Sequence, residues 1–398
     1  MTSGVVSRHA EARAVADFLA SASTEPSALV VEGEAGIGKT TLWLAGVEQA
    51  RGLGFRVLAA RGAAAESALA YASLADLLGG VDSSAFAGLP DPQRLALDRV
   101  LLRANTDSAA TDQRAVAAAL LSVVEGLAEE SPVLLAIDDL QWLDPSSVHV
   151  LAFAVRRLSA RVGMLGTVRT DSDGADGAAA WLQLPSPEGI HRIRVGPLSL
   201  GGLHAVLFAR LGRSLPRPTM VRIQEISGGN PFYALELARA IDRGLAGTEA
   251  SLPGTLAELV HARIGSLDPD VQDALLAAAC VAAPTVEVVA RASTHAGRIV
   301  ELLEDHAERK GIVSIDGHRL RFAHPLLARG VYTNATPAQR RMMHRRLAAI
   351  VEQPELRARH LALAATSGDP QTLQSLDAAA EMARMRGAAG AGNCERRR

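Results

Sequence analysis

Short apolar runs alternate with longer segments of helical periodicity in the first half of the chain. Such runs of strand length lie at 28–31, 55–60, 133–137 and 162–168, and the more polar segment 191–195 is a fifth strand candidate. Helical patterns cover 7–22, 41–50, 145–158 and most of 66–130, with a break near 79–92. A run that is apolar at every position is typical of a strand buried on both faces. Strands that alternate with helices predict an α/β domain whose parallel sheet has about five strands.

The pattern changes beyond residue 197, where helical periodicity dominates. The exception is 311–322, in which residues alternate on both sides of Asp316-Gly317 and predict a β-hairpin. A hairpin flanked by helices is the outline of a winged helix. We therefore expect an α/β domain at 1–196, a helical lid at 197–250, a winged-helix-like domain at 251–336, and a short all-α segment at 337–398 with a frayed tail.

A glycine-rich stretch follows the first apolar run and reads GEAGIGKT at 33–40. With a strand before it and a helix after it, this pattern predicts the phosphate-binding loop of a P-loop NTPase. The glycines let backbone N–H groups turn toward phosphate oxygens, and the helix adds its positive end. Lys39 is expected to contact and activate the β- and γ-phosphates of ATP, and the Thr40 hydroxyl to bind Mg²⁺. An ordinary glycine-rich turn is the alternative. The expected nucleotide contacts are Gly33, Glu34, Ala35, Gly36, Ile37, Gly38, Lys39, Thr40 and Thr41.

Two carboxylates, Asp138 and Asp139, end the apolar run at 133–137. Ligands of an open α/β sheet bind at this edge, so Asp138 is expected to hold Mg²⁺ and Asp139 to orient the attacking water as a catalytic group. The alternative is that the pair opens a loop or caps a helix. Asp144, which precedes Pro145, is interpreted as a helix cap.

Arg169 follows the apolar run at 162–168 and is a further catalytic candidate. Its guanidinium group could contact the γ-phosphate in a bidentate way, and an ordinary surface arginine is the alternative. The stretch SGGNPF at 227–232 predicts only a turn followed by the start of a helix.

Composition narrows the function further. The formal net charge of −2 gives no sign of the basic surface that nucleic-acid binding needs. The sequence has only two lysines, Lys39 and Lys310, so a lysine in the glycine-rich stretch suggests a chemical role. Cys280 and Cys394 lie too far apart in the sequence to indicate a disulfide scaffold or a cysteine metal site. No apolar run reaches the roughly 18 residues of a membrane span, so a cytoplasmic protein without a membrane partner is expected.

Six strings in the expected order resemble one family. They are VSRHAE at 6–11, GEAGIGKTT at 33–41, LAIDDLQWLD at 135–144, TVR at 167–169, GGNPFY at 228–233 and FAHPLLARGVY at 322–332. Together they resemble the N-terminal part of the large ATP-binding regulators of the LuxR family, which belong to the STAND class of AAA-like ATPases. The resemblance extends to about residue 386.

The resemblance implies further nucleotide contacts. Val6 and Arg8 would line the adenine, although Ser7 stands where the family usually has glycine. Pro231 would pack near the adenine from the lid, and His324 could contact the β-phosphate of ADP. For His324 the alternative is a structural histidine beside Pro325.

The resemblance also implies a function. Bound ATP or ADP would favour different domain arrangements, and slow Mg²⁺-dependent hydrolysis would reset the switch. The partners would be the nucleotide and either a second copy of the chain or a regulatory protein. Family members end in a DNA-binding helix-turn-helix, and no such segment follows in this sequence, which fits a shortened or frameshifted product. A nucleotide-binding remnant without output and a P-loop phosphotransferase are the alternatives.

Overall fold

The structure, a computed structural model, describes residues 8–64, 66–67, 69–103, 112–170, 179–242, 263–293, 298–365 and 373–379. The chain forms two compact units, one within Met1–Val206 and the other Leu207–Ala380. Each unit is described by itself below. The expected division into four domains is finer than these two units and stays a prediction. No helix in the described ranges is both long and apolar enough to cross a membrane.

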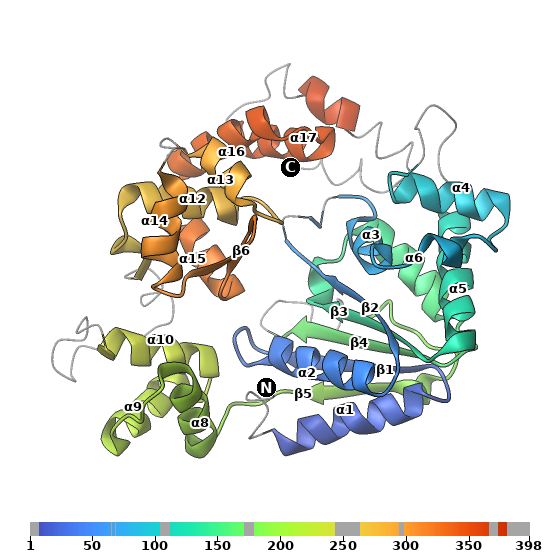
Figure 1. Cartoon of the computed structure of the whole chain (residues 1–398), viewed down its shortest axis with the longest axis horizontal. Coiled ribbons are helices and arrows are strands. Elements are labelled where there is room, and N and C mark those ends of the chain that lie inside the picture. The colour runs from blue at the N-terminus through green and yellow to red at the C-terminus, as the bar shows by residue number, and fades with distance from the viewer. Residues whose placement is uncertain are drawn as a thin grey trace. The chain divides into compact units, whose positions relative to one another are not determined.

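The first unit is built on a parallel sheet of five strands (Figure 1). The strands are β1 (Ser27–Gly33), β2 (Arg56–Arg61), β3 (Val133–Asp138), β4 (Val162–Arg169) and β5 (Ile190–Arg194). Their order in the sheet is β2-β3-β4-β1-β5, and every neighbouring pair is parallel. This confirms the α/β prediction. It also brings the carboxyl ends of β1, β3 and β4 together at one edge.

Helices cover both faces of the sheet. They are α1 (His9–Ala22), α2 (Lys39–Gly52), α3 (Ala72–Leu78), α4 (Asp91–Val100), α5 (Gln113–Glu130) and α6 (Pro145–Val155), with short 3₁₀ turns η1 (Ser83–Phe86), η2 (Leu140–Trp142) and η3 (Pro187–Gly189). Leu29 and Val31 of β1 share a core with residues of α1 and α2, whereas Ala28 and Val30 belong to the core that includes α5 and α6. Alternate side chains of one strand thus enter two cores, which explains why the central strands β1, β3 and β4 are largely apolar, whereas the edge strand β5 carries exposed polar residues.

The second unit is mostly helical. Its elements are the remainder of α8 (Leu200–Leu211), α9 (Arg217–Ser227), α10 (Pro231–Asp242), α12 (Pro269–Ala279), α13 (Val286–Ala292), α14 (Ile299–Leu302), the π-helical turn η5 (Leu303–Glu308), β6 (Val313–Asp316), β7 (Arg319–Phe322), α15 (Pro325–Asn334), α16 (Pro337–Ile350) and α17 (Pro354–Ala364).

The predicted hairpin is present as the antiparallel pair β6 and β7. Its two-residue turn is Gly317-His318, one position later than the expected Asp316-Gly317, because Asp316 still pairs with Arg319. Gly317 takes the left-handed conformation, φ 59°, that such a turn favours. An isolated bridge from Thr285 to Arg319 places a third extended segment beside the hairpin. The order of helices, bridge and hairpin from α12 to β7 is that of a winged helix.

A chain of buried polar side chains joins three helices of the second unit. Nδ1 of His344 in α16 lies 2.9 Å from Nδ1 of His360 in α17. The other ring nitrogen of His344, Nε2, lies 3.1 Å from the Tyr332 hydroxyl of α15. The two imidazoles are 3% and 2% exposed. A hydrogen bond between two Nδ1 atoms requires one of the two to carry no proton, so the two rings cannot both be protonated while this bond is present.

We expect the second unit to lose stability as the pH falls. Burial, followed by the charges of His360 and Arg359, lowers the pKa of His344 from 6.5 to about 4. Burial, followed by Arg359, lowers the pKa of His360 to about 4 as well. The unfolded chain therefore binds more protons than the folded one between about pH 6.5 and 4. Each histidine should lower the free energy of unfolding by at most about 1.4 kcal/mol per pH unit in that window.

Urea unfolding at pH 7 and at pH 5 measures how the free energy of unfolding changes with pH. Hydrogen exchange of the α16 amides monitors the unfolding of the second unit. His360→Gln should reduce the slope because it removes one of the two titrating groups. His318→Gln, at the exposed turn of the hairpin, is the control and should leave the slope unchanged. An unchanged slope in His360→Gln would contradict the assignment.

Candidate functional site

The loop between β1 and α2 has the backbone that phosphate binding requires. Gly36 and Gly38 have φ values of 79° and 109°, in the left-handed region that favours glycine. α2 begins at Lys39, immediately after the loop. The first amide groups of this helix are therefore directed at the loop, where they can bind an anion. The predicted phosphate loop thus has the expected strand, turn and helix.

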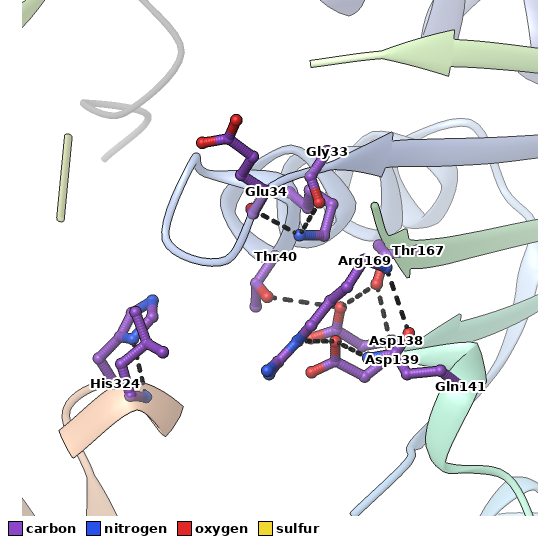
Figure 2. Close-up of polar contacts among 11 residues, drawn as sticks. Gly33, Glu34, Thr40, Asp138, Asp139, Gln141, Thr167, Arg169 and His324 are labelled. Carbon is purple, nitrogen blue, oxygen red and sulfur yellow. Dashed lines mark hydrogen bonds and ion pairs between the residues drawn. The ribbon is translucent and has the colours of Figure 1, made fainter. Parts of the chain in front are cut away.

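Lys39 lies against this loop. Its side chain is buried, and Nζ donates to the carbonyl oxygens of Gly33 and Glu34, both at 2.8 Å (Figure 2). These bonds hold the ammonium group at the loop, where it can contact phosphate oxygens. The Glu34 and Thr41 side chains are exposed, Ala35 is half-buried, and Ile37 is buried in the core beneath the loop.

Thr40 and Asp138 come from different elements and meet at the sheet edge. Thr40 Oγ1 donates to Asp138 Oδ1 at 3.4 Å, and Thr167 Oγ1 of β4 donates to the same oxygen at 2.7 Å (Figure 2). Burial, and then the charge of Asp139, raises the pKa of Asp138, whereas the two hydroxyl groups lower it. The sequence predicted roles for Thr40 and Asp138 but none for Thr167, although Thr167 lies near the carboxyl end of β4, the strand beside β3.

These oxygens fit a magnesium ion. Within the described ranges, no group of three or more histidine, cysteine, aspartate or glutamate residues could hold a metal. Mg²⁺, however, usually takes one or two protein oxygens and fills its other positions with water and phosphate oxygens. The Thr40 hydroxyl and the Asp138 carboxylate provide such a pair. The roles predicted for both residues therefore agree with their chemistry.

Asp139 begins the turn η2 with φ 60°, a left-handed conformation that aspartate tolerates better than most residues. Its backbone N–H donates to Thr167 Oγ1 at 2.8 Å. Its Oδ1 accepts from Gln141 Nε2 at 2.6 Å and from Arg169 Nε at 3.3 Å (Figure 2). The structure thus brings Asp139 and Arg169 together as an ion pair. Their predicted roles toward water and the γ-phosphate stay predictions.

Gln141 is a site residue that the sequence did not predict. Apart from its bond to Asp139, its Oε1 accepts from the backbone N–H of Arg169 at 3.4 Å. The only signal in the sequence is a polar side chain two positions after the acidic pair.

Arg8 contacts the phosphate loop itself. Its Nη2 donates to the Ile37 carbonyl oxygen at 2.6 Å, and its Nη1 forms an ion pair with Glu11 at 3.0 Å. The guanidinium group also lies beside Gly38, where an added Cβ would be 3.7 Å from Nη2. Arg8 therefore stabilises the phosphate loop through the Ile37 carbonyl oxygen. Its expected contact with adenine stays a prediction. Val6 lies outside the described residues.

Asp144 is the helix cap that the sequence predicted. Its fully buried carboxylate accepts from Ser147 N at 2.8 Å, at the start of α6. It also accepts from the backbone N–H groups of Tyr71 at 2.8 Å and Ser73 at 3.2 Å. One carboxylate thus fixes the starts of both α6 and α3.

Pro231 and His324 belong to the second unit. Pro231 begins α10, where Asn230 Oδ1 accepts from the backbone N–H of Phe232 at 3.1 Å, as the turn pattern predicts. His324 caps α15, because its Nδ1 accepts from Leu326 N at 3.1 Å. Its ring stacks on Phe232 with the centroids 3.8 Å apart. A structural role for His324 is therefore present, while its phosphate contact stays a prediction.

Comparison with known proteins shows which chains this one is similar to. Residues 4–166 match the family model described as an AAA ATPase domain. A Signal Transduction ATPase with Numerous Domains (STAND) protein with a tetratricopeptide repeat sensor, from Pyrococcus horikoshii, is 14% identical at a TM-score of 0.55. The match covers 94% of this chain but only 51% of that one.

A Walker-type ATPase from Pyrococcus abyssi is 16% identical at a TM-score of 0.40, over 81% of this chain and 95% of that one. No curated protein matches. At these identities, the likeness to the STAND protein shows the fold. The first unit therefore has the fold of a P-loop NTPase, and residues 4–166 are similar to an AAA ATPase domain.

Proposed function

We propose that this chain is an ATP-binding switch of the STAND class, acting within a LuxR-type transcriptional regulator. The observation that carries the proposal is the meeting of the phosphate loop with the acidic end of β3, where Thr40 Oγ1 lies 3.4 Å from Asp138 Oδ1. A hydroxyl group and a carboxylate beside a phosphate loop suit a nucleotide that carries Mg²⁺.

Each side chain of the site has a distinct part in the proposed hydrolysis. Lys39 would bind the β- and γ-phosphates, and Thr40 with Asp138 would hold Mg²⁺. The ion would neutralise negative charge on the phosphates. Asp139 would accept a hydrogen bond from the attacking water and so orient it. Arg169 would bind the γ-phosphate, and its present ion pair with Asp139 keeps it at the site.

The switch itself is supported by the second unit and by the sequence strings at 228–233 and 322–332. A nucleotide shifts a conformational equilibrium only if it binds the alternative arrangements with different affinities. The γ-phosphate is the group that could create this difference. We therefore propose that ATP and ADP favour different arrangements of the chain, and that hydrolysis resets it.

Limited proteolysis and small-angle X-ray scattering, with ADP or a non-hydrolysable ATP analogue, test the switch. We expect different cleavage patterns and different radii of gyration for the two samples. Lys39→Ala is the matched control and should give one profile with either nucleotide. If the wild-type chain binds both nucleotides and gives identical profiles, the chain is not a nucleotide switch.

Asp139→Asn is expected to retain ATP binding but to hydrolyse ATP at least about a hundredfold more slowly. The amide keeps the shape of the side chain but accepts protons far more weakly than the carboxylate. Steady-state phosphate release and calorimetric nucleotide titration measure the two properties. Asp17→Asn, at an exposed position of α1, is the control for the same chemical change. Loss of binding in a folded Asp139→Asn variant would mean that our division of roles is wrong.

A further inference from the structure

We infer that Gln141 is a positioning residue, which aims the Asp139 carboxylate for the attack of water on ATP. This inference rests on the proposed function. Gln141 lies in η2, two residues after Asp139, and joins the acidic end of β3 to the end of β4 (Figure 2).

The orientation of the Gln141 amide follows from its partners. The Asp139 carboxylate only accepts hydrogen bonds when ionised, so the Gln141 NH₂ group must face it, at 2.6 Å. The backbone N–H of Arg169 only donates, so the Gln141 carbonyl oxygen must face that group, at 3.4 Å. A reversed amide would oppose two acceptors on one side and two donors on the other. The side chain therefore has one orientation that satisfies both neighbours.

The two carboxylate oxygens of Asp139 differ in their hydrogen bonds. Gln141 Nε2 and Arg169 Nε both donate to Oδ1, whereas in the described part of the chain Oδ2 accepts no hydrogen bond. The Asp139 backbone is held as well, because its N–H donates to Thr167. With Oδ1 fixed from two directions, the side chain cannot turn freely, and Oδ2 is the oxygen left to accept a proton from water. Gln141 thus selects which oxygen acts.

Packing of the η2 turn depends on the neighbours of Gln141 rather than on Gln141. Leu140 lies on Gly166 of β4, where an added Cβ would come within 2.5 Å of Leu140 Cδ1. Trp142 lies beside Gly62, where an added Cβ would be 3.1 Å from Trp142 Cβ. Both hydrogen bonds of the Gln141 side chain, in contrast, go to the two catalytic candidates. Its loss should therefore affect turnover more than folding.

Two variants separate positioning from packing. Gln141→Leu removes both hydrogen bonds at similar volume, and its kcat for ATP hydrolysis should fall by about tenfold to a hundredfold. Gln141→Glu keeps the shape and the acceptor but sets a second carboxylate against Asp139, so its kcat should fall at least as far. In both variants the Kd for ATP and the melting temperature should stay near the wild-type values. A packing role predicts the reverse order, since the isosteric glutamate would be tolerated better than leucine.

A double-mutant cycle tests whether Gln141 acts through Asp139. In an Asp139→Asn background, adding Gln141→Leu should not lower kcat further, because the group that it positions is already lost. Gln49→Leu, at an exposed position of α2, is the matched control and should leave kcat unchanged. Additive losses, or an unchanged kcat in Gln141→Leu while the wild-type chain hydrolyses ATP, would overturn the inference alone. A wild-type chain that neither binds nor hydrolyses ATP would overturn the proposed function and this inference with it.

Discussion

Lys39→Ala is expected to lower the affinity of the chain for ATP and ADP by about a hundredfold or more. The variant removes the only lysine of the first unit, and with it the cation that the loop holds for the β- and γ-phosphates. Lys39 as a whole is 6% exposed, so a phosphate bound there meets the charge of a largely buried side chain. Charge-assisted hydrogen bonds in such surroundings are strong.

Isothermal titration calorimetry with ADP measures the loss without depending on hydrolysis. Lys310→Ala is a natural control, because it removes the chain's other lysine, in the second unit. The Lys39→Ala variant also removes the lysine hydrogen bonds to the Gly33 and Glu34 carbonyl oxygens, which keep only their backbone donors, so its melting temperature should be recorded. Normal nucleotide affinity in a folded Lys39→Ala variant would contradict the whole site assignment.

The sheet and the phosphate loop could be predicted because their signals are local. The central strands β1, β3 and β4 are largely apolar at successive positions since both of their faces are buried, and this pattern needs no knowledge of distant residues. The loop needs glycine at positions of positive φ, such as Gly36 and Gly38, so the positions of its glycines predict its conformation. The cap role of Asp144 could be predicted for the same reason, because the backbone N–H group of Ser147 that it accepts from is three residues away.

The contacts that sequence reasoning missed are long-range. Thr167 meets Asp138 only because β3 and β4 are parallel neighbours, a pairing that spacing along the chain does not reveal. Arg8 reaches the Ile37 carbonyl oxygen across 29 positions, so no local pattern distinguishes this contact from an adenine contact. Gln141 is close to Asp139 in sequence, but its second bond runs to β4. The residue types were visible, but their partners depended on how the strands pack.

The second unit contains the long-range contact with the largest expected effect on stability. Glu236 of α10 forms an ion pair with Arg263, and both side chains are 1% exposed. Arg263 also donates to the carbonyl oxygen of Lys310, which precedes the hairpin, and Arg239 donates to Glu236 at 3.1 Å. A helix of the predicted lid is thus tied to the winged-helix elements through buried charges. The pair lies 27 positions apart, so no local pattern in the sequence reveals that the two residues meet.

Glu236→Ala is expected to lower the free energy of unfolding of the second unit by about 3–5 kcal/mol. The variant leaves the Arg263 guanidinium group buried without the Glu236 carboxylate, and removing one partner of a buried ion pair costs more than the pair itself is worth. Urea denaturation of the full chain measures this decrease in the free energy of unfolding. Hydrogen exchange of the α10 and α12 amides monitors the unfolding of the second unit. Glu287→Ala is the control, because Glu287 and Arg291 form an exposed pair at 3.9 Å whose loss should change stability by less than about 1 kcal/mol.

Replacing both buried charges separates their pairing from their packing. Glu236→Leu combined with Arg263→Met should be more stable than either single replacement, because neither member of the buried pair then remains without the other. The double variant still removes the hydrogen bond of Arg263 to the Lys310 carbonyl oxygen and that of Arg239 to Glu236. Its stability therefore need not return to the wild-type value. If the double variant were as unstable as the sum of its two single variants, the pair would not be coupled, and the tie between α10 and the winged-helix elements would depend on packing alone.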